Sequence, residues 1–250
     1  MLFPVRPGAE LWQRLRASGG ELALAFASLL VAGSVALILG SVLGDLLPAG
    51  LARLIGFVVG PTVTAVAALL YRAAIRGLDE FAGVQIVSEV SDDWPRRSVA
   101  EATLVVAVGV LAAIGGSFLL SHLMIWLGLP IEEQPGIVAI IEEAKQSGDW
   151  LPLVVLAAAA VGLAPWAEEW LFRGLLFRRI AAQAHWPEAL FVSGIAFALI
   201  HGNAAGFVVY LWLGIVFALT YRWSGRLWAA VLVHAANNLM ALVGLVFFEN

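Results

Sequence analysis

Seven long apolar stretches, separated by polar segments, follow one another along this sequence. The first consists of 22 consecutive uncharged residues, and a helix needs about 20 residues to cross the hydrocarbon core of a membrane. The fifth stretch is short, and its boundary with the sixth is poorly marked. The pattern predicts seven membrane-spanning helices, at residues 22–43, 54–71, 102–127, 151–172, 188–202, 204–221 and 227–248.

The composition identifies lipid as the solvent of these stretches. Apolar residues make up 62% of the chain and charged residues only 13%, with a mean hydropathy of +0.93, whereas about a quarter of the residues of a soluble domain are charged. Spanning segments in lipid are helices or closed barrels, and unbroken apolar runs do not match the alternating strands of a barrel. We therefore expect an all-α polytopic bundle of about seven helices, with residues 1–250 forming one membrane domain.

Basic residues are distributed unevenly between the polar segments. Of the 14 lysines and arginines, 12 fall in alternate segments and 2 in the others. Cytoplasmic loops carry the excess of such residues, so the N-terminus is predicted to be cytoplasmic, residues 77–101 cytoplasmic and residues 128–150 outside. A short amphipathic surface helix is expected at 136–146. The protein is expected in the cell membrane, and no basic stretch indicates nucleic-acid binding.

Ionisable side chains within the apolar stretches are the candidates for function, because a charge near the bilayer centre costs roughly 2.5–3.5 kcal/mol. Glu168, Glu169 and Arg173 form the first such group. Glu169 and Arg173 are four residues apart, which predicts an ion pair on one helix face, while Glu168 points about 100° away and is free for another role. The simpler alternative is an ion pair at a helix end, near the cytoplasmic interface.

Two further polar groups occur in the fifth and seventh stretches. Phe197 and His201 lie one turn apart, as do His234 and Asn238, and Asn237 adjoins the latter. Hydrogen bonding between helices explains each group taken alone, and Asn237 is expected to do only that. Together, however, three of the last four stretches each bring a catalytic residue type to membrane depth, which favours a shared site.

The residue types indicate hydrolysis of an amide bond. A carboxylate beside an imidazole can hold and deprotonate water, and a second imidazole with an amide can donate to the developing oxyanion. The chain contains no cysteine, which excludes a thiolate nucleophile, and no HExxH helix of a zinc protease occurs.

The three groups also resemble the motifs of a known family. Glu168-Glu169-x-x-x-Arg173, Phe197-x-x-x-His201 and His234-x-x-x-Asn238 are similar in order and spacing to those of the CPBP family. This family, also called Abi, comprises type II CAAX-prenyl-protease-like and bacteriocin-processing or self-immunity membrane proteins. The resemblance covers a motif-bearing core of about residues 150–250.

The resemblance implies an intramembrane endopeptidase in which Glu168 and His201 activate water while His234 and Asn238 stabilise the oxyanion. Glu169, Arg173 and Phe197 would support them. The alternative is a zinc hydrolase with the ligands Glu168, His201 and His234. We favour the metal-free site, because a carboxylate that binds zinc no longer serves as the base and the stretches offer few carboxylates to orient the histidines.

Two non-enzymatic functions remain as alternatives. The chain could be a catalytically idle immunity or scaffold protein that binds a partner, or a proton-coupled transporter, since buried Glu and His also form proton relays. The complete motifs favour the protease. Its expected partners are membrane lipid and a protein or peptide substrate, either prenylated or a peptide precursor, reached through a water-accessible cavity that opens to the cytoplasm.

Overall fold

The structure is a computed structural model that describes residues 9–44, 46–83, 96–129 and 135–248. The described residues form helices joined by turns, and none of them lies in a strand. In chain order the elements are α1 (Ala9–Gly44), α2 (Ala49–Phe81), α3 (Val99–Trp126), α4 (Pro135–Ser147), α5 (Leu151–Ala158), η2 (Ala159–Leu163), α6 (Ala164–Glu169), η3 (Trp170–Phe177), α7 (Arg178–Gln183), α8 (Trp186–Ile200), α9 (Phe207–Ser224) and α10 (Leu227–Phe247).

All seven predicted apolar stretches form helices. Six helices, counted over the described residues, have the length and composition to cross a membrane. The fifth stretch forms α8, whose 15 residues rise only about 22 Å at 1.5 Å per residue, less than the thickness of a hydrocarbon core. The prediction of a polytopic helical membrane bundle is confirmed, and the protein is a multi-pass integral membrane protein.

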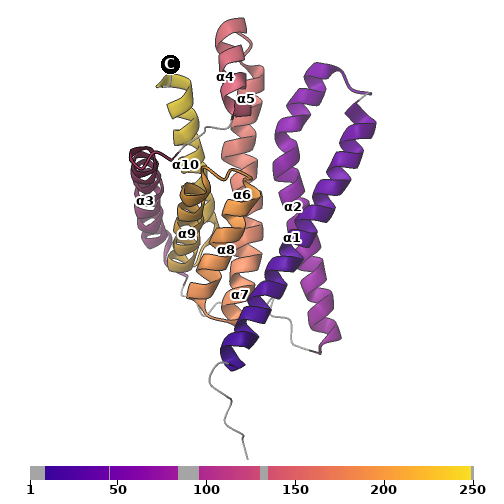
Figure 1. The fold of residues 1–250 in the computed structure, drawn as a ribbon, viewed down its shortest axis with the longest axis vertical. Helices are drawn as coiled ribbons and strands as arrows, with labels where there is room; N and C mark the ends of the chain where they lie inside the picture. Colours follow the sequence, from indigo (N-terminus) through magenta and orange to yellow (C-terminus); the bar gives the residue numbers. More distant parts are fainter. Residues whose placement is uncertain (1–8, 45, 84–95, 130–134, 249–250) are drawn as a thin grey trace, which may run out of the picture.

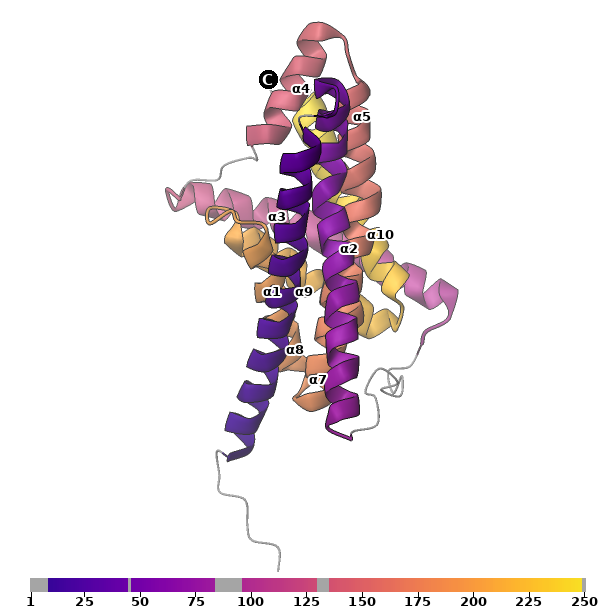
Figure 2. The same ribbon diagram turned by 90° about the vertical axis from the view of Figure 1, so that its right-hand side faces the viewer.

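One helix occupies the centre of the bundle. The elements from α5 to α7 form a continuous helix, 151–183, that is interrupted by the two π-helical segments η2 and η3. This central helix contacts α2, α8, α9 and α10. The α1–α2 hairpin lies on one side of it and α3, α9 and α10 on the other (Figure 1), and α3 crosses the bundle at a steep angle (Figure 2).

The sequence prediction ended this span near residue 172 and counted Arg173 with the basic residues that follow it, and this is wrong. Arg173 is fully buried and the helix continues to Gln183. A charge is tolerated there because the bundle supplies its partners, as described below. Without Arg173, the lysines and arginines of the polar segments are still distributed unequally between alternate segments.

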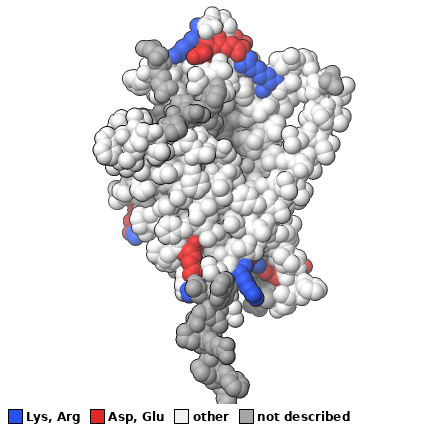
Figure 3. Space-filling model, viewed as in Figure 1, with Lys and Arg blue, Asp and Glu red and all other residues white. Residues whose placement is uncertain are grey.

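On the face that Figure 3 shows, charged side chains gather towards the two ends of the molecule and leave an uncharged band between them. The end that carries α4 includes Arg53, whose guanidinium donates two hydrogen bonds to the Glu143 carboxylate, at 2.7 and 2.5 Å. These bonds hold the pKa of Glu143 below its ordinary value. The helix expected at 136–146 is present as α4, which packs Ile141 and Ala144 against α5 and α10.

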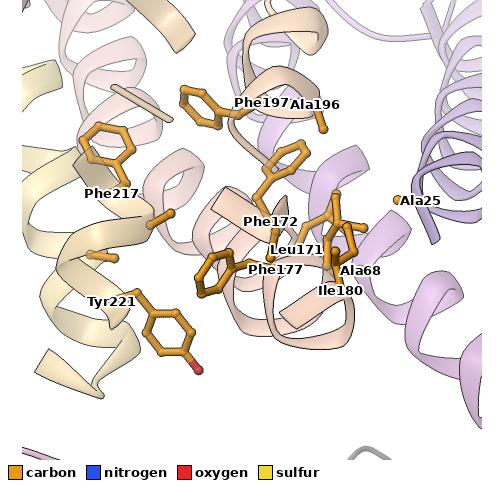
Figure 4. Close-up of a cluster of buried hydrophobic side chains, with 14 of the residues drawn as sticks. Ala25, Ala68, Leu171, Phe172, Phe177, Ile180, Ala196, Phe197, Phe217 and Tyr221 are labelled. Atoms are coloured by element: carbon orange, nitrogen blue, oxygen red, sulfur yellow. The ribbon is translucent and has the colours of Figure 1, made fainter. Parts of the chain in front are cut away.

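An aromatic core packs the central helix against α8 and α9. Phe172 of η3 packs edge-on against Phe197 of α8, which in turn packs against Phe217 of α9 (Figure 4). Phe177 of η3 packs against Tyr221 of α9. Helices α8 and α9 approach closely because both lack a side chain at the crossing: a Cβ on Gly214 would lie 2.9 Å from the Cα of Gly194. Small residues permit such close contact between membrane helices.

Candidate active site

An ion pair lies at the centre of the bundle. The Nη1 of Arg173 donates to the Oε1 of Glu169 at 2.8 Å, and its Nη2 donates to the carbonyl of Gly214 at 2.8 Å. Both charged side chains are fully buried. The guanidinium also lies over the rings of Phe197, at 4.6 Å, and Phe217, at 5.3 Å. Charge, hydrogen bonds and aromatic faces together make burial of this arginine tolerable.

The same carboxylate oxygen binds His234. The Nδ1 of His234 donates to the Oε1 of Glu169 at 2.9 Å, since a carboxylate can only accept. This bond fixes the orientation of the imidazole, which also stacks on Phe217 with 4.5 Å between ring centroids. The bond could not be predicted from the sequence, because nothing in the spacing of two residues 65 positions apart indicates contact.

Glu168 faces the other nitrogen of the same imidazole. Its Oε2 lies 3.9 Å from the Nε2 of His234, and this buried oxygen has no hydrogen-bond partner among the described residues. Two consecutive carboxylates therefore flank one imidazole, and each faces a different nitrogen. The angle of about 100° between neighbouring side chains on a helix predicted that the two glutamates would face different groups.

His201 lies directly after the last residue of α8, before the left-handed Gly202 (φ 61°) ends the helix. Its Nδ1 donates to the carbonyl of Phe197 at 2.8 Å, which leaves the lone pair on Nε2. The ring stacks on Tyr210, with 4.1 Å between centroids. Among the described residues no hydrogen bond joins His201 to Glu168; the ring of Phe197 contacts both His201 and His234.

Asn238 joins α10 to the first π-helical segment. Its Nδ2 donates to the carbonyl of Ala160 in η2 at 2.9 Å, which uses one of its two amide protons. The Nδ2 of Asn237 lies 3.5 Å from the Oδ1 of Asn238 on the same helix, a long contact and not the hydrogen bond between helices that was expected of Asn237. The π-helical segments flank Glu168 and Glu169 on both sides, and such segments are frequent at functional sites.

A cavity of about 370 Å³ connects these side chains. His201, His234 and Asn238 line it, and it extends to Ile137 of α4; Glu168 is not among its described lining residues. The sequence predicted a cavity that opens to the cytoplasm; in the structure the cavity extends towards α4 and away from the basic end. The cause is the additional length of the central helix, which places its glutamates further from the basic end than a span ending at 172 would.

The proposed zinc ligands do not form a metal centre. No three His, Asp or Glu side chains of the described residues are grouped as ligands of one ion, so Glu168, His201 and His234 do not fit one in this arrangement. One sequence argument against zinc is nevertheless wrong, because Glu169 does supply a carboxylate that orients His234.

Comparison with known proteins finds similarity in this region. Residues 149–240 match the family model described as type II CAAX prenyl endopeptidase Rce1-like. The chain is 22% identical over 148 residues to the "Putative membrane peptidase YdiL" of Bacillus subtilis, covering 55% of this chain and 57% of that protein. It is 30% identical over 94 residues to the "Membrane-embedded CAAX protease MroQ" of Staphylococcus aureus, covering 35% and 37%.

The aligned regions thus span about half of the first relative and less of the second, and no solved structure matches the chain significantly. The matched segment contains all four candidate residues: Glu168, His201, His234 and Asn238. The resemblance to the type II CAAX-prenyl-protease-like family, inferred from three short motifs, is confirmed for this segment.

Proposed function

We propose that this protein is an intramembrane endopeptidase that hydrolyses a peptide bond with a water molecule activated by Glu168 and His201. One observation carries the proposal: a buried carboxylate oxygen of Glu168, which no described residue binds, lies beside His234. His234 itself lines a cavity together with His201 and Asn238. A buried carboxylate oxygen without a partner is costly, and such costs persist at sites where the group is used.

In the proposed reaction Glu168 is the general base. Its carboxylate takes a proton as water attacks the peptide carbonyl, and later returns it to the amine that leaves. The Nε2 of His201 accepts a hydrogen bond from the same water and so directs its lone pair at the carbonyl carbon. The bond of Nδ1 to Phe197 fixes the tautomer that this role needs.

Stabilisation of the oxyanion falls to His234 and Asn238. Because the Nδ1 of His234 donates to Glu169, its Nε2 donates to an oxyanion only in the imidazolium form. Asn238 contributes the amide proton that Ala160 does not use. Glu169 and Arg173 hold His234 in place and do not touch the substrate.

The cavity supports a substrate that lies in or on the membrane. Apolar side chains of α5, α9 and α10 line it beside the polar site: Leu156, Val209, Leu213, Ala241, Leu242 and Leu245. Such walls suit a hydrophobic peptide segment or a lipid-modified tail. We propose a membrane-associated protein as the substrate, either a prenylated protein or a peptide precursor.

Comparative peptidomics tests this function directly. Peptides would be quantified in cells that express either wild-type protein or Glu168→Gln at equal levels, with Glu142→Gln on the exposed surface of α4 as the matched control. Peptides that appear with wild type and the control but not with Glu168→Gln would support proteolysis. Identical peptide pools from all three would favour an idle binding protein or a transporter.

A further inference from the structure

A second cavity lies at the end of the bundle opposite α4. It has a volume of about 480 Å³ and lies where α2, the central helix and the α9–α10 turn meet. Trp170 and Gly174, on either side of the buried Arg173 in the sequence, form part of its wall. The proposed peptidase mechanism uses none of its lining residues: Arg72, Ile75, Arg96, Trp170, Gly174, Leu175, Arg178, Arg179, Tyr221, Gly225, Arg226, Leu227 and Trp228.

The charge of this wall is entirely positive. Five of its residues are arginines, and no described lining residue is acidic. The charge of Arg179 is neutralised by ion pairs with Asp79 and Glu21. Arg226 donates its Nε to the neutral carbonyl of Arg97 at 2.9 Å. No acidic side chain among the described residues pairs with Arg72 or Arg226, so a site for an anion remains between α2 and the α9–α10 turn.

The rest of the wall is aromatic and aliphatic. Indoles are enriched at the level of the lipid headgroups, and Trp170 and Trp228 lie beside the arginines here. Leu175 and Leu227 add apolar surface. A wall that combines guanidinium groups with indole and leucine side chains matches a ligand that joins an anionic head to an apolar tail, and guanidinium binds phosphate oxygens in pairs.

We propose that this cavity binds the phosphate of an anionic phospholipid, with Arg72 and Arg226 as the principal donors. Basic cavities between membrane helices bind the headgroups of acidic lipids. The bound phosphate would join α2 to the α9–α10 turn, two elements that approach the central helix from different sides. Inorganic phosphate offers the same chemistry, so the experiment must distinguish the two sources.

Binding is measured on purified full-length protein in detergent from which lipid has been removed. Phosphatidylglycerol, phosphatidylcholine and inorganic phosphate are each titrated, with native mass spectrometry and thermal unfolding as independent readouts. Phosphatidylglycerol should bind wild type and raise its melting temperature, and phosphatidylcholine should do neither. Arg72→Gln should weaken phosphatidylglycerol binding roughly tenfold or more, as expected for a lost hydrogen bond between charged groups.

Arg76→Gln is the matched control, since Arg76 is an exposed residue one turn along the same helix and is not part of the cavity wall. It should bind phosphatidylglycerol as wild type does. Inorganic phosphate that competes at equal concentration would identify a soluble phosphate as the ligand. Equal binding of both phospholipids, or equal loss in Arg72→Gln and Arg76→Gln, would overturn the proposal. The measurement needs no peptidase activity, so it stands or fails independently of the proposed function.

Discussion

At the scale of single residues, the two adjacent glutamates differ in what they touch. Through its Oε1, Glu169 binds Arg173 and the Nδ1 of His234, whereas Glu168 faces the Nε2 side at 3.9 Å and forms no such bond. Each carboxylate keeps one buried oxygen, Oε2, that no described residue binds. The first is therefore expected to organise the site and the second to react.

Glutamine substitutions separate these two roles. Glu168→Gln should lower peptidase activity at least about 100-fold, because the amide cannot act as a base, and should leave thermal unfolding unchanged. Glu169→Gln should lower both activity and stability, with a destabilisation of the order of 3 kcal/mol for a buried pair deprived of one partner. Activity and melting curves are measured on the same preparations. Substantial activity in Glu168→Gln would exclude Glu168 as the base. If both variants lost activity and stability alike, the two glutamates would not have separate roles.

The neighbouring asparagines offer a second paired test. Asn238→Ala should lower the turnover rate roughly 100-fold, the usual consequence of removing an oxyanion donor, whereas Asn237→Ala should have a small effect. Both side chains line the same cavity, so a general disturbance of it would affect both variants. Equal rates in the two variants would remove Asn238 from the mechanism.

The requirement for metal is tested on active purified protein. We expect well under one zinc per chain, and activity that survives dialysis against a strong chelator, because Glu168 is needed as a base and a ligand carboxylate is not free to serve as one. Stoichiometric zinc, with activity lost on chelation and restored by zinc, would instead identify a metalloprotease.

At the scale of elements, the site depends on how closely α8 and α9 approach the central helix. The carbonyl of Gly214 accepts a hydrogen bond from Arg173, and the same glycine abuts Gly194. Backbone contact between the two helices therefore fixes Arg173, and through Glu169 it fixes His234. The π-helical segment η2 adds a second such contact, because its Ala160 carbonyl accepts a hydrogen bond from Asn238.

Adding one methyl group should disturb this arrangement. In Gly214→Ala the new Cβ would meet backbone atoms of Gly194 at 2.9 and 3.0 Å, so the helices must separate, at a cost of about 1–3 kcal/mol typical of overpacking. Both melting temperature and activity should fall. Gly244→Ala in α10 is the control, since its Cβ meets nothing within 4 Å and alanine favours helix. A Gly214→Ala protein as stable as this control would show that the contact is not tight.

At the scale of the whole molecule, the charge distribution predicts orientation. Charged side chains occupy the two ends of the face in Figure 3, and the five arginines of the second cavity lie at the end away from α4. The positive-inside rule assigns that end to the cytoplasm, so the active-site cavity, which extends towards α4, is expected to open on the other side of the membrane.

Cysteine labelling tests the orientation, because the chain has no native cysteine. A membrane-impermeant reagent applied from outside should modify Ser147→Cys at the end of α4 and should not reach Ala82→Cys after α2. Permeabilised cells, in which both should react, provide the control. The reverse labelling pattern would invert the topology and place the cavity on the cytoplasmic side.

The sequence by itself determined the solvent, the secondary structure and the identity of the candidate residues. Each depends on local information: the length of an apolar run sets a spanning helix, and spacing along one helix sets which side chains share a face, as it did for Glu169 and Arg173. The rarity of polar residues in lipid made the three motifs visible without any structure.

The tertiary structure decided where charge can be buried and which groups meet. From the sequence the central span ended at residue 172, because charge is costly in lipid and Arg173 had no partner in sight other than Glu169. Gly214, Phe197 and Phe217 on other helices lower that cost further. None of these partners has a polar side chain, so no sequence pattern indicates them. The bond between Glu169 and His234 likewise depends on how α10 packs against the central helix, which is a property of the folded bundle and not of either segment alone.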